Sequence, residues 1–233
     1  GISRVGPRFR LGDIMQDTAE TVAEAPSTPS PSPVRGSQLR QRLVDCGLAL
    51  IEGEGAGEAG FSLREVARAS GVSHMAPYVF FQSKNDLLSA IAAAGFRMLL
   101  GDLEAAVLRA GASPRARLIE LGLAYIDFGL ARPQLIRLMF GGRIPLSERS
   151  EELRQIHGQG FMATVAIIEA GMKCGQFRQG DAFVAAFSGW SLLQGFSQLV
   201  LGGELQEKVG ASQQSVRTSA QKVIETFLNG LDA

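Results

Sequence analysis

Apolar residues recur along most of the chain at the spacing of amphipathic helices. Leu39, Leu43, Cys46 and Leu50 fall at i, i+4, i+7 and i+11, which places them on one face of a helix over residues 37–53. Later stretches repeat this spacing, and no run alternates apolar and polar residues for long enough to predict a strand. The pattern therefore predicts an all-α protein of nine helices.

Capping residues and helix breakers set the bounds of the predicted helices. One helix is predicted to begin at Ser113, which precedes a proline, and a short one at Pro133. A reciprocal cap is expected where Ser83 precedes Asp86 by three positions. The long predicted helices cover residues 37–53, 84–110, 146–173, 181–201 and 212–228.

Two short helices joined by a tight turn are predicted between Phe61 and Lys84. Ser62 is the expected N-cap of the first helix, Gly71 makes the turn, and Ser73 is the expected N-cap of the second. This arrangement is the sequence form of a helix-turn-helix unit, whose second helix enters the major groove of DNA. The alternative is an ordinary helical hairpin in an all-helical protein.

The first 36 residues differ from the rest of the chain. The stretch 25–34 alternates Pro with Ser and Thr, a composition that forms no packed element. Arg4, Arg8 and Arg10 could contact DNA phosphates as a flexible arm, although the low hydrophobicity favours a solvated tail. We therefore predict a disordered tail over 1–36, a DNA-binding domain over 37–84 and a second domain over 85–233.

The composition argues against several classes of function but does not identify one. The chain has 23 Lys and Arg and 23 Asp and Glu, so its net charge is zero, but a local basic patch is enough for DNA. Two cysteines and two histidines, all distant in sequence, are too few for a metal site, and no nucleophile arrangement is recognisable. We expect no metal, no cofactor and no catalytic residue. No apolar run approaches the roughly 18 residues of a membrane span and no signal peptide is visible, so a cytoplasmic protein is expected.

The block from Leu39 to Leu88 resembles the N-terminal domain of the TetR family of transcriptional regulators. The resemblance rests on a Leu-rich first helix, a Gly-rich loop, FSLREVARASGVS, APY, Phe81 and SKNDLL. The second half resembles the branch with a WHG-type C-terminal domain, through ARPQLIRLMFGG, Trp190 and Gly195. Gln194 stands where that branch usually has His. The resemblance implies a two-domain, homodimeric regulator that binds a palindromic operator in double-stranded DNA, most often as a repressor that a small-molecule effector releases.

The second short helix supplies the expected base contacts. His74 can hydrogen-bond a base edge, and Met75 and Ala76 can contact thymine methyl groups. The resemblance implies phosphate contacts for Tyr78, Lys84 and Ser62 and places Arg64 near the groove. Lys84 also lies in the first turn of a helix, where its charge opposes the dipole unless an anion is near. The predicted DNA-contact residues are Ser62, Arg64, Ser73, His74, Met75, Ala76, Tyr78 and Lys84.

Several of these residues have alternative interpretations. Tyr78 and Met75 could be core residues, and Arg64 could belong to a solvated helix face. Val79 and Phe80 are expected to be exposed, although the resembled family often has polar residues at these two positions. A helical regulator that acts through a protein partner is therefore the alternative to DNA binding.

The last two predicted helices are the candidates for dimerisation. Residues 181–201 are apolar on almost every side, so a partner must cover whatever the chain's own core does not. The resemblance points to the same two helices forming a four-helix interface. The predicted interface residues are Phe183, Phe187, Leu193, Phe196, Val216, Val223 and Phe227.

A ligand pocket is expected among the helices of the second domain. Few charged residues interrupt the candidate set, which favours a largely apolar or aromatic ligand. Each member could equally be an ordinary core residue. The predicted lining residues are Phe96, Tyr125, Phe128, Met139, Phe140, Phe161, Met162 and Trp190.

Overall fold

The computed structural model describes residues 33–53, 61–204, 208, 210 and 212–233. These residues confirm the all-α prediction, since their only bridge is an isolated one between Phe177 and Asp232. The predictions for the tail over 1–32 and the Gly-rich loop over 54–60 lie outside the described residues. The elements are α1 (Pro33–Glu52), α2 (Leu63–Ala69), the 3-10 helix η2 (Ala76–Val79), α3 (Lys84–Arg109), α4 (Pro114–Ala131), α5 (Pro133–Phe140), the 3-10 helix η3 (Leu146–Glu148), α6 (Glu151–His157), α7 (Gln159–Lys173), α8 (Ala182–Leu201) and α10 (Gln213–Asn229).

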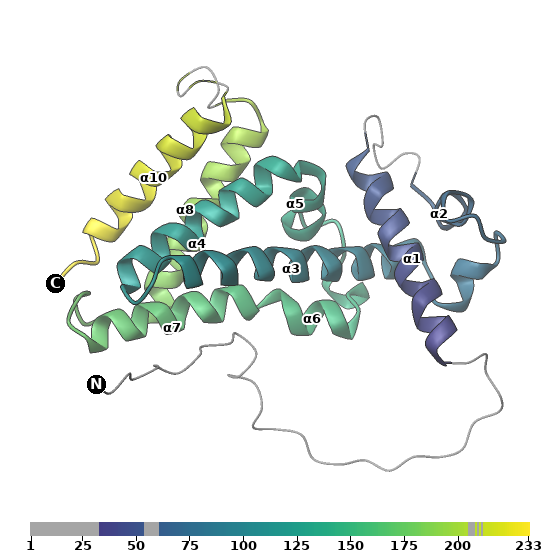
Figure 1. Cartoon of the computed structure of the whole chain (residues 1–233), viewed down its shortest axis with the longest axis horizontal. Helices are drawn as coiled ribbons and strands as arrows, with labels where there is room; N and C mark the ends of the chain where they lie inside the picture. The colour runs from purple at the N-terminus through teal and green to yellow at the C-terminus, as the bar shows by residue number, and fades with distance from the viewer. Residues whose placement is uncertain (1–32, 54–60, 205–207, 209, 211) are drawn as a thin grey trace, which may run out of the picture.

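Helix α3 runs through the middle of the molecule (Figure 1). It packs against α1 near its N-terminal end and against α4, α5, α6 and α7 along its length. Its residues 87–96 are all buried, including six small ones that let neighbouring helices approach closely. The N-terminal helices and the C-terminal bundle therefore share one long helix.

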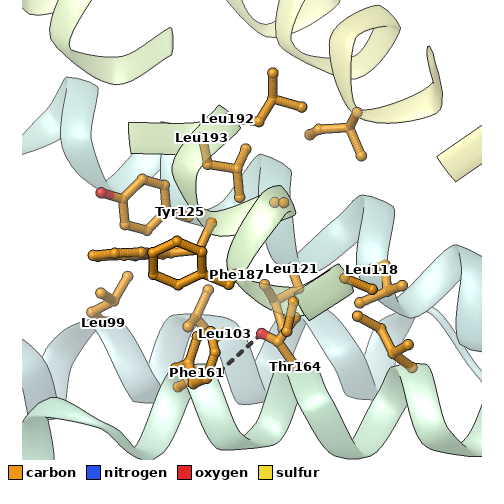
Figure 2. Close-up of a pocket in the computed structure, with 18 of the residues that line it drawn as sticks. Leu99, Leu103, Leu118, Leu121, Tyr125, Phe161, Thr164, Phe187, Leu192 and Leu193 are labelled. Atoms are coloured by element: carbon orange, nitrogen blue, oxygen red, sulfur yellow. Dashed lines mark hydrogen bonds between the residues drawn. The ribbon is translucent and has the colours of Figure 1, made fainter. Parts of the chain in front are cut away.

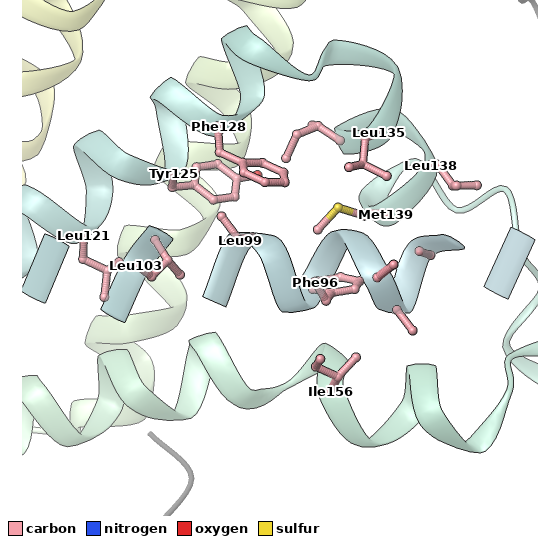
Figure 3. Close-up of a cluster of buried hydrophobic side chains, with 14 of the residues drawn as sticks. Phe96, Leu99, Leu103, Leu121, Tyr125, Phe128, Leu135, Leu138, Met139 and Ile156 are labelled. Carbon is pink, nitrogen blue, oxygen red and sulfur yellow. The ribbon is translucent and has the colours of Figure 1, made fainter. Parts of the chain in front are cut away.

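The core of the C-terminal bundle forms between α3, α4 and α5 (Figure 3). Phe96, Leu99 and Leu103 of α3 are buried, and so are Tyr125 and Phe128 of α4. Helices α8 and α10 both pack against α4, and α7 packs against both α4 and α8. The apolar stripes found in the sequence are thus buried against one another, as amphipathic helices require.

The predicted N-caps are largely confirmed. The hydroxyls of Ser62, Ser83 and Ser113 each accept a hydrogen bond from a backbone N–H of the following turn. Asp181 caps α8 by accepting bonds from the N–H groups of residues 183 and 184. The reciprocal bond expected at Ser83 differs slightly, because Asp86 accepts the N–H of residue 82 rather than that of the cap itself.

Two boundary predictions were wrong. Helix α1 begins at Pro33, inside the segment predicted as tail, because proline suits the first turn of a helix. The single helix predicted over 146–173 is divided into η3, α6 and α7. Ser150 starts α6 as its N-cap, and Gly158 ends it, since glycine is a poor helix former.

Helix α8 also corrects the expectation that no apolar run is long enough to span a membrane. Its 20 residues reach that length and hydropathy, and 28% of the apolar window is buried within the chain. The helix nevertheless packs against α4, α7 and α10, so it is a member of the helical bundle. Its remaining exposed apolar face needs another cover in water.

The close packing along α3 can be tested at two of its glycines. A Cβ on Gly95 would lie 2.8 Å from Met139 Sδ and 2.9 Å from Leu135 Cδ1, whereas one on Gly101 would meet nothing within 4 Å. We expect Gly95→Leu to lower the free energy of unfolding by about 1–3 kcal/mol through overpacking. The matched Gly101→Leu should raise it by up to about 1 kcal/mol. Urea denaturation followed by circular dichroism measures both, and equal effects would contradict the packing described.

Candidate functional site

The turn after α2 orients the element that follows it. Ser70 is the C-cap of α2 and Gly71 has a φ of 66°, in the left-handed region. The N–H of Val72 donates to the carbonyl of Ala67 (3.1 Å), and that of Gly71 donates to Arg68 (3.2 Å). These two bonds form a Schellman motif, in which glycine is the residue that adopts the left-handed conformation without strain.

The predicted second helix is a 3-10 helix, η2, and Ser73 is not its N-cap. An α-helix starting at Ser73 would need the N–H of residue 77 as its first donor, and Pro77 has none. The carbonyl of Ser73 instead accepts from Ala76 (3.0 Å), and that of Met75 accepts from Tyr78 (3.1 Å). The short element is therefore held by i→i+3 bonds, which are the bonds of a 3-10 helix.

The exposed face of this element carries most of the residues predicted to contact bases. Ser73 and His74 are exposed, Met75 is 58% exposed, Tyr78 is 46% exposed, and Ala76 is half-buried. The core interpretations of Tyr78 and Met75 were therefore wrong.

The opposite face of the element packs inward. Pro77 and Phe81 are buried, and Val72 packs against the same core. Phe80 was expected to be exposed, but it is half-buried and packs there as well, with its ring 6.4 Å from that of Phe81. Val79 is 76% exposed, so it adds an apolar side chain to the exposed surface of this element.

Polar groups flank the element on both sides. Ser62 uses an oxygen lone pair to cap α2, accepting from Glu65 at 3.2 Å, and its O–H remains able to donate. Arg64 is exposed on α2. The Lys84 ammonium lies 5.9 Å from the centre of the Phe61 ring, which holds this cation at the N-terminus of α3.

A second group of contacts joins α6 to the N-terminal helices. Glu152 of α6 accepts hydrogen bonds from Arg40 of α1 (3.3 Å) and from Arg97 of α3. Just before α6, Glu148 accepts from the side chain of Asn85 (2.6 Å), and its carbonyl accepts from Ser89 (3.3 Å). The segment 148–152 therefore contacts both α1 and the first two turns of α3.

The other end of α6 reaches a cavity of about 330 Å³ in the C-terminal bundle. Figure 2 shows side chains of α3, α4, α7 and α8 converging on it, among them Leu99, Leu121, Phe161 and Phe187. Residues of α10 complete the wall. Its size and its mostly apolar lining are typical of small-molecule sites.

The structure places five of the eight predicted lining residues on the cavity: Phe96, Tyr125, Phe140, Phe161 and Trp190. The other three predictions were wrong. Phe128 and Met139 are buried in the neighbouring core, whereas Met162 is 53% exposed on α7.

The sequence prediction missed the leucines of the wall and also missed His157. The leucines at 99, 103, 118 and 121 have the spacing of any helical core, so nothing in the sequence marks them as lining. His157 is the last residue of α6, and its ring centre lies 5.1 Å from that of Phe96. The His-Gly step that ends α6 was its only local signal.

Few polar groups reach the cavity. The Tyr125 hydroxyl donates to Gln194 Oε1 at 2.6 Å, so the glutamine that replaces the expected histidine serves as an acceptor. Burial raises the pKa of Tyr125, which keeps the hydroxyl protonated. Thr164 donates to the carbonyl of Gly160 (3.0 Å). Burial, with a smaller contribution from the Arg149 charge, lowers the pKa of His157 and favours the neutral imidazole.

One face of α8 stays uncovered. Val184, Ser188, Ser191, Gly195 and Leu199 repeat at helical spacing and are all exposed. Beside them, the predicted interface residues Phe183 and Phe187 are 54% and 52% exposed. Leu193, Val223 and Phe227 are partly buried. Phe196 and Val216 are buried in the chain's own core, so predicting them as contact residues was wrong.

The C-terminal bundle matches a known protein family. Residues 118–227 match the family model for the "Tetracyclin repressor-like, C-terminal domain". No curated protein matches the chain.

Several solved structures are similar. A Rhodococcus sp. RHA1 protein with unknown function is 33% identical, with a TM-score of 0.72, over 87% of this chain and 100% of that one. A bacterial regulatory protein in the TetR family from Rhodococcus RHA1 is 21% identical, with a TM-score of 0.60, over 83% and 97% of the two chains. The TetR family transcriptional regulator PfmR from Thermus thermophilus is 21% identical, with a TM-score of 0.59, over 82% and 100%.

The burial of His157 predicts how stability responds to acid. The unfolded chain takes up a proton on this histidine near its ordinary pKa of about 6.5, whereas the folded chain takes it up only at lower pH. Between these values the unfolded state binds more protons, so the free energy of unfolding falls as the pH falls. Urea denaturation at about pH 7 and pH 5 should show a smaller loss for His157→Phe than for the wild type.

The other histidine supplies the control for this measurement. His74 is exposed and does not line the cavity, so His74→Phe shows whether losing any histidine has the same effect as losing His157. An equal loss in His157→Phe and the wild type would contradict the burial of His157.

Proposed function

Because the chain belongs to the TetR family of transcriptional regulators, we propose that it acts as a homodimeric repressor that a small, largely apolar ligand releases from a palindromic operator. The observation that carries the proposal is one chain that combines an exposed element after a Schellman turn with a cavity of about 330 Å³. We place the protein in the cytoplasm, where its DNA target would be, and assign it no enzymatic role.

DNA contact is proposed for the surface around η2. His74 and Met75 are exposed where a base edge could be reached, and Tyr78 is exposed on the same element. The O–H of Ser62, the guanidinium of Arg64 and the ammonium of Lys84 are assigned to phosphates, which fix the orientation of the protein on the duplex. The apolar surface of Val79 leaves this site dependent on shape and phosphate contacts more than on hydrogen bonds to bases.

A second copy of the chain is the proposed cover for α8. The exposed stripe has apolar residues at its ends and Ser188, Ser191 and Gly195 between them, so two helices could approach closely. A Cβ on Gly195 would meet nothing within 4 Å in the single chain, which leaves room for a partner. Two-fold dimers read two half-sites, which gives a single small reading element useful specificity.

Helix α6 is the proposed link between ligand and DNA. Its last residue, His157, lines the cavity, while Glu152 binds Arg40 and Arg97 about one helical turn away. A ligand that shifts α6 would alter these ion pairs and the position of α1 relative to α3. Because the ligand favours one of two arrangements, it changes the half-site spacing through differential affinity.

Dimerisation can be tested by placing a charge on the exposed face of α8. We expect the wild type to have twice the 24.8 kDa mass of the chain in sedimentation equilibrium, and Val184→Asp to sediment as a monomer. Leu108 is a similarly exposed apolar residue on α3, so Leu108→Asp should remain a dimer. A dimeric Val184→Asp protein would contradict the α8 interface.

DNA binding can be tested with a gel shift on the region upstream of the protein's own gene. Tyr78→Ala and Lys84→Ala should each weaken binding roughly tenfold, or about 1.4 kcal/mol. Loss of one phosphate contact in Lys84→Ala should also reduce the slope of log affinity against log salt by about 0.9.

Lys173→Ala is the matched control, because Lys173 is an exposed lysine at the far end of α7. It should change neither the affinity nor the salt slope. Absence of binding to any palindromic DNA at low salt would overturn the proposed function and favour a protein partner at the Val79 surface.

A further inference from the structure

The cavity has an uneven distribution of polar groups that identifies the kind of ligand it can hold. Of its 26 described lining residues, none is Lys, Arg, Asp or Glu. An ionised ligand group would therefore lose its water without gaining a counter-charge, which is costly in an apolar site. An uncharged ligand avoids that cost.

Three of the four polar side chains that line the cavity gather around one aromatic ring. The ring centre of Phe140 lies 5.9 Å from that of Tyr125, 6.3 Å from that of His157 and 6.4 Å from that of Trp190. The remaining wall is made largely of leucines, such as Leu118, two helical turns before Tyr125 on α4. Seven residues of helix span about 10 Å, so Leu118 lies roughly that far along α4 from Tyr125. Figure 2 shows the remaining polar side chain, Thr164, beside Leu121, and its hydroxyl is already bonded to the carbonyl of Gly160.

Two of the lining residues carry an N–H group that has no partner within the described part of the chain. The Tyr125 and Thr164 hydroxyls donate to Gln194 and Gly160. By contrast, neither the imidazole of His157 nor the indole N–H of Trp190 has a hydrogen bond to any described residue. A neutral imidazole carries one N–H donor and an indole is a donor only, so both groups suit an acceptor oxygen.

We propose that the cavity binds an uncharged, elongated apolar molecule with one acceptor oxygen, such as a ketone or an ester, and that His157 and Trp190 donate to that oxygen. This assignment rests on the proposed function only in treating the cavity as the effector site. The apolar body of the ligand would lie along α4 toward Leu118.

The chain supplies its own reporter for this proposal, because Trp190 is its single tryptophan and lines the cavity. Titration of the full-length protein without DNA, at pH 7.5, should show saturable changes in Trp190 fluorescence with 2-octanone. Octanoate, with the same chain length but a charge, should bind at least about tenfold more weakly. Equal or tighter binding of octanoate, or no saturable binding of either probe, would overturn the proposal.

Variants separate hydrogen bonding from packing. His157→Phe keeps a ring in place and should weaken 2-octanone binding about fivefold, whereas His157→Gln retains an N–H donor and should recover part of that loss. Met162→Ala, at an exposed position on α7 away from the cavity, should bind as the wild type does. Unchanged affinity in His157→Phe, with the fold verified by circular dichroism, would overturn the role of His157.

The ligand assignment and the proposed regulator function can fail independently of each other. If 2-octanone binds with this selectivity while no DNA is bound, the ligand assignment holds and the regulator proposal fails. If DNA is bound but the probes show no selectivity, the regulator proposal holds and the ligand assignment fails.

Discussion

The burial of α3 on all sides over residues 87–96 is the constraint on which the rest of the structure depends. Ser89, four alanines and Gly95 keep this stretch narrow, so α1, α5 and α6 can all pack against it. A buried helix in a close-packed interior moves as a unit and does not bend continuously. The DNA-contact element η2 and the cavity in the C-terminal bundle are therefore connected through one rigid helix, α3.

Helix α6 adds a second connection that runs beside α3. Glu152 holds Arg40 and Arg97, and Ser89 joins α3 to the segment before α6. These ion pairs are partly exposed, so each one contributes little to the stability of the fold. Their value lies in geometry, because they tie the position of α1 to the helix whose last residue lines the cavity. A cavity wall made by a short, separately capped helix can move more readily than one made by α3.

The sequence predicted well the features that depend on neighbours in the chain. Ser62, Ser83 and Ser113 cap helices where expected, because an N-cap is satisfied within its own first turn. The 3-10 form of η2 was missed, because it depends on a single absent donor: Pro77 has no N–H for the first i→i+4 bond of a helix that starts at Ser73.

The cavity lining could be predicted only in part. Lining residues and core residues have the same spacing in the sequence, and only the tertiary packing decides which of them face the cavity. Tyr125 and Phe128 are one helical turn apart on α4, yet the first lines the cavity and the second lies in the core.

The central claim is that ligand binding in the cavity is coupled to DNA binding at η2. It is tested most directly by measuring the affinity for 2-octanone through Trp190 fluorescence, with and without saturating upstream DNA. Reciprocal coupling predicts weaker 2-octanone binding to the DNA-bound protein, by the same factor by which 2-octanone weakens DNA binding. Equal affinity in the two states would contradict it.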